Sequence, residues 1–224
     1  MANTTRASKS TKLMERPMPR MTRTIFAALI FASAAAISMP GAAADKKASA
    51  IFAGGCFWCV ESDFDKVPGV ISTTSGYIGG SAKTANYKTI TSRPTGHYEA
   101  VRIVYDPDKV SYRRLLNVFW RSVDPTDAGG QFCDRGHSYK TAVFVKNEDQ
   151  RKIALGTKKK AEETLGKKIV TKIQTAGPFY KAENYHQDYY KRNPVRYKVY
   201  RYGCGRDQKI RSLWGQEAHA GIKH

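Results

Sequence analysis

The 224-residue chain is long enough for one domain with a substantial hydrophobic core, or for two very small ones. A hydrophobic content of 41% and an aromatic content of 11% exclude a wholly disordered chain. The formal net charge of +19 and the thirteen tyrosines keep a basic nucleic-acid-binding protein under consideration.

The first 44 residues have the pattern of a secretory signal rather than of a globular domain. Basic residues precede a short apolar run from Thr24 to Ala36, and small residues at 41–44 follow it. This pattern predicts cleavage near Ala44 and export, to the periplasm, with Met14 or Met21 as the initiator. The alternative is an uncleaved anchor, but a membrane span needs about 18 apolar residues. We therefore expect no stable membrane span after cleavage.

Residues 45–224 are predicted to form a single domain in which strands and helices alternate. Strands are expected at 48–53, 70–77, 99–105, 141–145 and 169–173, and helices at 56–66, 111–119 and 148–165. This order favours an α+β fold with helices on one face of a mixed sheet. The C-terminal tail, residues 196–224, has little periodic apolar pattern. It is predicted to be irregular, mobile and wrapped on the surface.

Cys56 is the strongest candidate for a nucleophile. It follows Gly54 and Gly55 at the junction of a predicted strand and a predicted helix. Backbone N–H groups at a helix N-terminus stabilise a thiolate, and glycines let a substrate approach the backbone. Two large apolar rings, those of Phe57 and Trp58, come next to the sulfur.

Other interpretations of the four cysteines remain open from the residues alone. A free cysteine is often a small buried apolar residue, and an exported chain often carries structural disulfides. A zinc site would need a second paired set of ligands, whereas Cys133 and Cys204 are isolated, so no metal is predicted. The spacing of Cys56 and Cys59 also suits a thiol–disulfide oxidoreductase, which is the alternative function.

The run Gly55-Cys56-Phe57-Trp58 resembles the signature of the peptide methionine sulfoxide reductase A family. The similarity continues through residues 60–61, 68–70, 75–80, Tyr87, 95–101, 127–136, Tyr139, 179–180, 182–183 and 186–187. It covers about residues 48–215, and so many separated motifs make a specific match. The resemblance implies a two-layer α/β sandwich with a ferredoxin-like core, a monomer, and no cofactor.

The resemblance implies that the chain reduces methionine S-sulfoxide, free or in proteins. Cys56 would attack the sulfur of the sulfoxide, and Glu99 would donate a proton, since burial keeps a carboxyl protonated near neutral pH. The remaining residues that the resemblance assigns are the hydroxyl donors Tyr87 and Tyr139, the organising residue Asp134, and the apolar rings of Phe57 and Trp58, which hold the substrate methyl. His186 matches the family too, but a single histidine in a helix is more often structural, so we leave it out of the catalytic set.

Attack leaves Cys56 as a sulfenic acid, which a second thiol converts to a disulfide before a thioredoxin-like reductant restores it. Many family members carry this resolving cysteine in the C-terminal tail, and Cys204, between two glycines, fits that position. Cys59 is the alternative, although a disulfide to Cys56 along one helix is strained. Cys133 is the least favoured candidate for the resolving cysteine.

Two rival functions explain less of the sequence. A thiol–disulfide oxidoreductase that uses Cys56 and Cys59 has no need of Glu99, Tyr87 or Tyr139. A binder of nucleic acid or of an acidic polymer would gather its basic residues in stripes, whereas the lysines and arginines are scattered. We therefore expect methionine sulfoxide and a thioredoxin-like reductant as partners, and no nucleic acid.

Overall fold

The computed structural model describes residues 14–16 and 46–223. The predicted signal at 1–44 lies outside the described residues, apart from 14–16. Residues 43–224 form the second of the two units of the chain. No helix among the described residues is long and apolar enough to cross a membrane.

A six-stranded mixed sheet forms the centre of the second unit. Its strands are β1 (Ala48–Gly54), β2 (Val70–Ile78), β3 (Tyr98–Tyr105), β6 (Thr141–Val145), β7 (Lys172–Thr175) and β8 (Phe179–Lys181). They lie in the order β7-β6-β1-β3-β2-β8, and only the pair β6–β7 is parallel. Two short strands, β4 (Gly130–Gln131) and β5 (Asp134–Arg135), pair separately. The predicted mixed sheet is confirmed.

The described residues form seven α-helices: α1 (Phe57–Phe64), α2 (Tyr87–Ser92), α3 (Tyr112–Trp120), α4 (Glu148–Leu165), α5 (Tyr189–Arg192), α6 (Pro194–Gly203) and α7 (Arg206–Trp214). Short 3-10 turns lie at Ala82–Thr84, His137–Tyr139, Asn184–His186 and Gly215–Glu217. The side chains of Asn86, Ser111 and Asn147 each accept a hydrogen bond from a backbone N–H of the first turn of α2, α3 and α4. These caps satisfy N–H groups that have no partner inside a helix.

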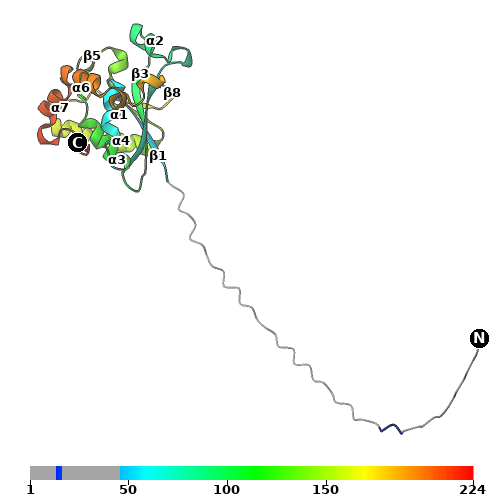
Figure 1. The fold of residues 1–224 in the computed structure, drawn as a ribbon. Helices are drawn as coiled ribbons and strands as arrows, with labels where there is room; N and C mark the ends of the chain where they lie inside the picture. The colour runs from blue at the N-terminus through cyan, green and yellow to red at the C-terminus, as the bar shows by residue number, and fades with distance from the viewer. Residues whose placement is uncertain (1–13, 17–45, 224) are drawn as a thin grey trace, which may run out of the picture. The chain divides into compact units, whose positions relative to one another are not determined.

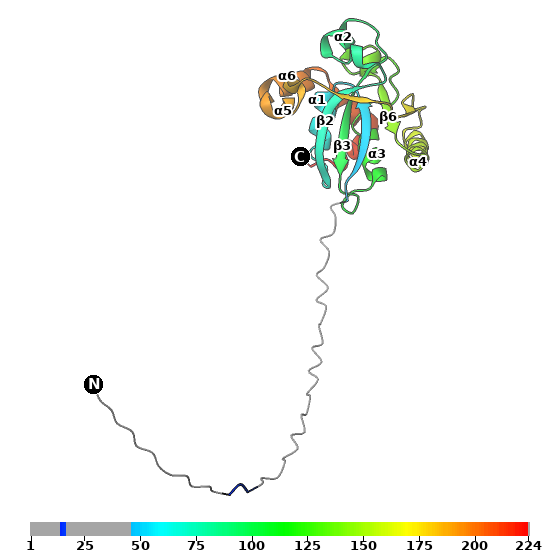
Figure 2. The ribbon, with the colours of Figure 1, turned by 90° about the vertical axis from the view of Figure 1, so that its right-hand side faces the viewer.

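Successive side chains along a strand point to opposite faces of the sheet, so the core has two parts, one on each face. Phe52 and Val101 point to the face that α1 and α3 cover, while Ile51 and Ala100 point to the other face, where Phe179 packs against them. Figure 1 shows α1, α3 and α7 on one side of β1 and β3, and in Figure 2 the opposite face of the sheet is turned toward the viewer. The helices therefore form one layer and the sheet the other, as an α+β fold requires.

The prediction that residues 196–224 are largely irregular was wrong. The tail contains α6 and α7, and Ile210 and Trp214 of α7 are buried in the main core. Pro194 begins α6, because proline is well tolerated in the first turn of a helix. The strand predicted at 169–173 also begins later, at Lys172.

Substitution of Ile210 by alanine tests whether the C-terminal helices belong to the core. Ile210 is fully buried, so Ile210→Ala should lower the free energy of unfolding by about 2–5 kcal/mol. Val199→Ala in α6 is the control, since Val199 is 69% exposed and its loss should cost within about 0.5 kcal/mol. Urea unfolding measures both. Equal effects of the two substitutions would mean that α7 does not pack as described.

Candidate active site

The junction of β1 and α1 positions Cys56. Cys56 is the N-cap residue of α1, and its side chain is only 6% exposed. Gly55 has a φ of +82°, and a Cβ atom there would lie 2.5 Å from the Cβ of Gln131. Both the backbone angle and the lack of space require glycine at this position. The predicted nucleophile therefore lies at a helix N-terminus with little access to water.

Glu99 of β3 lies directly beside this junction. Its Oε2 accepts a hydrogen bond of 3.0 Å from the backbone N–H of Phe57, and its side chain is 1% exposed. Burial raises the pKa of Glu99 to about 8, and the nearby charges of Asp134 and Cys59 add to this rise, although the Phe57 N–H opposes it. Glu99 is therefore largely protonated at neutral pH and has a proton to donate.

Tyr87 and Tyr139 bring two hydroxyl groups to the same place from α2 and from the turn at His137–Tyr139. Tyr139 is close enough to both Tyr87 and Glu99 to lower the pKa of each. Burial raises the pKa of Tyr87 to about 12 and also raises that of Tyr139. Both hydroxyls therefore keep their protons. The backbone N–H of Tyr87 is held by Oε1 of Glu183 at 2.9 Å.

Asp134 comes from the short strand β5. Its side chain is half-buried, and this burial raises its pKa. Oδ2 of Asp134 accepts a hydrogen bond from the hydroxyl of Tyr200 in α6. The sequence analysis did not identify Tyr200, because it placed this residue in an irregular tail.

The two rings that follow Cys56 have different environments. Phe57 is fully buried, and its ring lies against His186, with the two ring centroids 4.9 Å apart. Trp58 is half-buried, stacks on Tyr189 at 3.7 Å between ring centroids, and donates its indole N–H to Nδ1 of His186 at 3.0 Å. Burial lowers the pKa of His186 to about 4, so this histidine is neutral and can accept that hydrogen bond.

The four cysteines form two pairs. Cys56 and Cys59 are free and buried, and the neighbouring Cys56 thiol lowers the pKa of Cys59. Burial raises the pKa of Cys56 well above its ordinary value. Cys133 and Cys204, 71 residues apart, form a disulfide, although the sequence analysis gave Cys133 little weight. Cys133 is exposed to solvent.

These cysteines give little basis for a metal site in the described residues. The ligand atoms of Cys133, Asp134 and Cys204 lie within 4.8 Å of one another. Two of these three atoms are the sulfurs of the disulfide, however, and a disulfide offers no thiolate to a metal ion.

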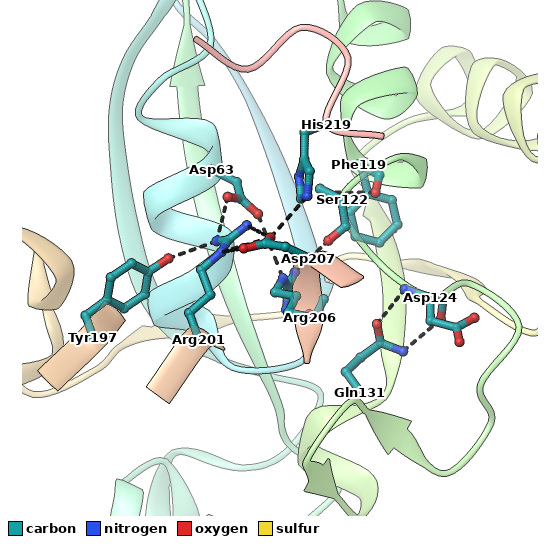
Figure 3. A network of polar contacts seen from close by, with 11 residues as sticks. Asp63, Phe119, Ser122, Asp124, Gln131, Tyr197, Arg201, Arg206, Asp207 and His219 are labelled. Atoms are coloured by element: carbon teal, nitrogen blue, oxygen red, sulfur yellow. Dashed lines mark hydrogen bonds and ion pairs between the residues drawn. The ribbon is translucent and has the colours of Figure 1, made fainter. Parts of the chain in front are cut away.

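A polar network anchors the C-terminal helices to α1 (Figure 3). Arg201 of α6 pairs with Asp63 of α1 and with Asp207 of α7, each at 2.7 Å. Arg206, whose side chain is 1% exposed, donates hydrogen bonds to the carbonyl oxygens of Gly54 and Ser122. The Gly54 carbonyl immediately precedes the junction that holds Cys56. The sequence analysis did not identify these arginines, because buried and exposed arginines look alike in a sequence.

The sequence matches a known family along most of its length. The model of the peptide methionine sulfoxide reductase family matches residues 48–218. Peptide methionine sulfoxide reductase MsrA 2 of Rhizobium meliloti is 53% identical over 83% of this chain and 92% of its own length. Peptide methionine sulfoxide reductase MsrA of Bacillus licheniformis is 49% identical over 78% of this chain and 97% of its own length.

Solved structures agree with the sequence comparison. Mxr1 of Saccharomyces cerevisiae in its reduced form aligns with a TM-score of 0.62 and 29% identity, over 66% of this chain and 87% of its own. Methionine sulfoxide reductase A of Corynebacterium diphtheriae aligns with a TM-score of 0.59 and 28% identity, over 70% of this chain and 78% of its own. The chain therefore belongs to the peptide methionine sulfoxide reductase A family and reduces methionine sulfoxide to methionine.

Proposed function

We propose that this reductase works through Cys56 as nucleophile and Glu99 as general acid. One observation carries this proposal. Phe57 directly follows Cys56, and its backbone N–H donates a hydrogen bond to the buried carboxyl of Glu99. It brings a protonated acid and a thiol to the same helix N-terminus. Reduction of a sulfoxide needs both groups, because sulfur is attacked while oxygen is protonated.

The first chemical step converts the thiol to a sulfenic acid. The sulfur of Cys56 gives up its proton as it bonds to the sulfur of the sulfoxide, and Glu99 gives its own proton to the oxygen, so the number of protons in the site does not change. The hydroxyl then passes to Cys56 as the new sulfur–sulfur bond breaks, which releases methionine. Cys56 is oxidised by two electrons and the sulfoxide is reduced by two, so no cofactor enters the balance.

The other predicted residues have roles that fit their surroundings. Tyr87 and Tyr139 keep their protons, and their hydroxyls can donate hydrogen bonds to the sulfoxide oxygen as its charge develops. Trp58 is the more accessible of the two apolar rings and would contact the substrate methyl directly. Phe57 lies behind it as part of the core, and Asp134 organises the side of the site that faces α6.

Recycling begins when a second thiol attacks the sulfenic acid, which forms a disulfide and releases water. We propose Cys204 for this role, with Cys59 as the alternative. Cys204 is bonded to Cys133, so it becomes available only after that disulfide is reduced. Cys133 is exposed while Cys56 and Cys59 are buried, which gives an external dithiol such as a thioredoxin-like protein access to the Cys133–Cys204 bond.

Export to the periplasm, with cleavage near Ala44, is also part of the proposal. Its support is the basic head, the short apolar run and the Ala-x-Ala exit of the first 44 residues. An exported reductase repairs oxidised proteins in a compartment that favours disulfides, so it depends on an external dithiol for turnover.

Replacement of the nucleophile tests the proposed function directly. Cys56→Ser should abolish the reduction of methionine S-sulfoxide with any reductant, because a serine hydroxyl cannot take up the oxygen as a thiol does when it becomes a sulfenic acid. The measurement is methionine released per enzyme in a single turnover. Activity within about tenfold of the unmodified enzyme would show that another residue is the nucleophile.

The resolving cysteine is tested by comparing Cys204→Ser with Cys59→Ser. We expect Cys204→Ser to release one methionine per enzyme and then stall with thioredoxin, while dithiothreitol, which attacks a sulfenic acid directly, restores turnover. Cys59→Ser should have a much smaller effect. Mass spectrometry of peptides after one turnover identifies the bond that formed. A Cys56–Cys59 bond with Cys204 outside any bond to Cys56 would assign the role to Cys59.

A further inference from the structure

We propose that Tyr200 is a further catalytic residue, whose hydroxyl passes the proton of the Cys56 thiol to the carboxylate of Asp134. This inference rests on the proposed role of Cys56 as nucleophile. It assigns a chemical role to helix α6, which the reaction described above does not otherwise use.

The site needs a group that takes the proton from Cys56. A thiolate attacks sulfur, whereas a thiol does so poorly, and burial keeps Cys56 in its thiol form. Glu99 cannot accept this proton while it is itself protonated and serves as the acid. Cys59 is a poor acceptor as well, since its pKa is lowered and a weaker base holds a proton less tightly.

Tyr200 lies between the nucleophile and a suitable acceptor. Its hydroxyl donates a hydrogen bond to Oδ2 of Asp134, and Tyr200 is also the neighbour whose polar group lowers the pKa of Cys56, against the larger effect of burial. The edge of its ring meets the face of Trp58, with centroids 5.7 Å apart and an angle of 78° between the rings. The ring also packs on the cluster formed by Cys56, Cys59 and Tyr197. These contacts fix the hydroxyl in the position that a proton relay requires.

The relay conserves atoms and charge. As the sulfur of Cys56 bonds to the sulfoxide, its proton moves to the oxygen of Tyr200, and the proton of Tyr200 moves to Asp134. Tyr200 is thus neutral before and after the step. The rise in the pKa of Asp134 on burial makes its carboxylate a stronger base. Exchange with solvent then returns Asp134 to its charged form and Glu99 to its protonated form.

The position of Tyr200 does not depend on the Cys133–Cys204 disulfide. Arg201, the next residue, is held by Asp63 of α1 and Asp207 of α7, as Figure 3 shows. The same arginine donates a hydrogen bond of 2.8 Å to the hydroxyl of Tyr197. Helix α6 therefore stays attached to α1 when the disulfide is reduced, which is the state that attacks the substrate.

The other titratable groups near Cys56 come from several different elements of the fold. They are Cys59 of α1, Tyr87 of α2, Glu99 of β3, Asp134 of β5, Tyr139 of the turn at His137–Tyr139, and Tyr200 of α6. Of these, the two tyrosines near Glu99 are placed to bind the sulfoxide oxygen, and Asp134 is the carboxylate that the Tyr200 hydroxyl contacts.

The test compares Tyr200→Phe with Tyr197→Phe in a single turnover. Tyr200→Phe removes the relay but keeps the ring, so the rate of methionine release at pH 7 should fall about 100-fold. The rate of Tyr200→Phe should rise between pH 6 and about 8, because the thiol then ionises without the relay, and should level off above about pH 8, where Glu99 loses the proton that it donates. Tyr197 lies on the same helix, and its hydroxyl contacts Arg201 instead of Asp134, so Tyr197→Phe should stay within about threefold. Thermal unfolding should be similar for both variants.

A double-mutant cycle with Asp134→Asn completes the test. If Tyr200 passes its proton to Asp134, the double variant should be little slower than either single variant, since each breaks the same path. The inference is overturned if Tyr200→Phe keeps the original rate and pH profile, if Tyr197→Phe loses as much, or if the two effects simply multiply. Cys56→Ser separates the two proposals: a fully active Cys56→Ser enzyme contradicts the role of Cys56 itself, whereas an inactive one beside a normal Tyr200→Phe enzyme contradicts only the relay.

Discussion

Exclusion of water from the junction of β1 and α1 is the constraint on which the chemistry depends. A carboxyl in water is ionised at neutral pH, but Glu99 is buried there, with the Phe57 N–H as its backbone partner. Desolvation also keeps Cys56 as a thiol. In the proposed mechanism, the resting site thus holds an acid that can donate at once and a nucleophile that is activated only during attack.

Keeping water out requires a cover, and the C-terminal helices supply it. Arg201 and Arg206 would be costly to bury alone, but pairing with Asp63 and Asp207 and hydrogen bonds to backbone carbonyls offset that cost. The same contacts hold α6 and α7 against α1. Cys133 remains exposed, so the proposed mechanism has the substrate react at the buried Cys56 and the reductant at the Cys133–Cys204 disulfide.

The sequence predicts the part of the site that lies in local motifs. Cys56 after two glycines, and Glu99 at the start of an alternating strand, are placed by turn chemistry and by period-two patterning. The inward side of α6 carries Tyr197, Tyr200 and Arg201 instead of aliphatic residues, so its periodicity is hidden. The Cys133–Cys204 bond joins residues 71 apart, which spacing alone cannot reveal.

The protonation state of Glu99 is the most direct test of this account. The pKa of Glu99 is raised to about 8, so the folded protein binds its proton more tightly than the unfolded chain. The stability that this contributes is complete at low pH and is lost as pH rises toward 8. Infrared difference spectroscopy against Glu99→Gln isolates the carbonyl stretch of this one protonated carboxyl. The account predicts that the band is present at pH 7 and disappears with a midpoint near 8. A carboxylate band already complete at pH 6 would contradict it.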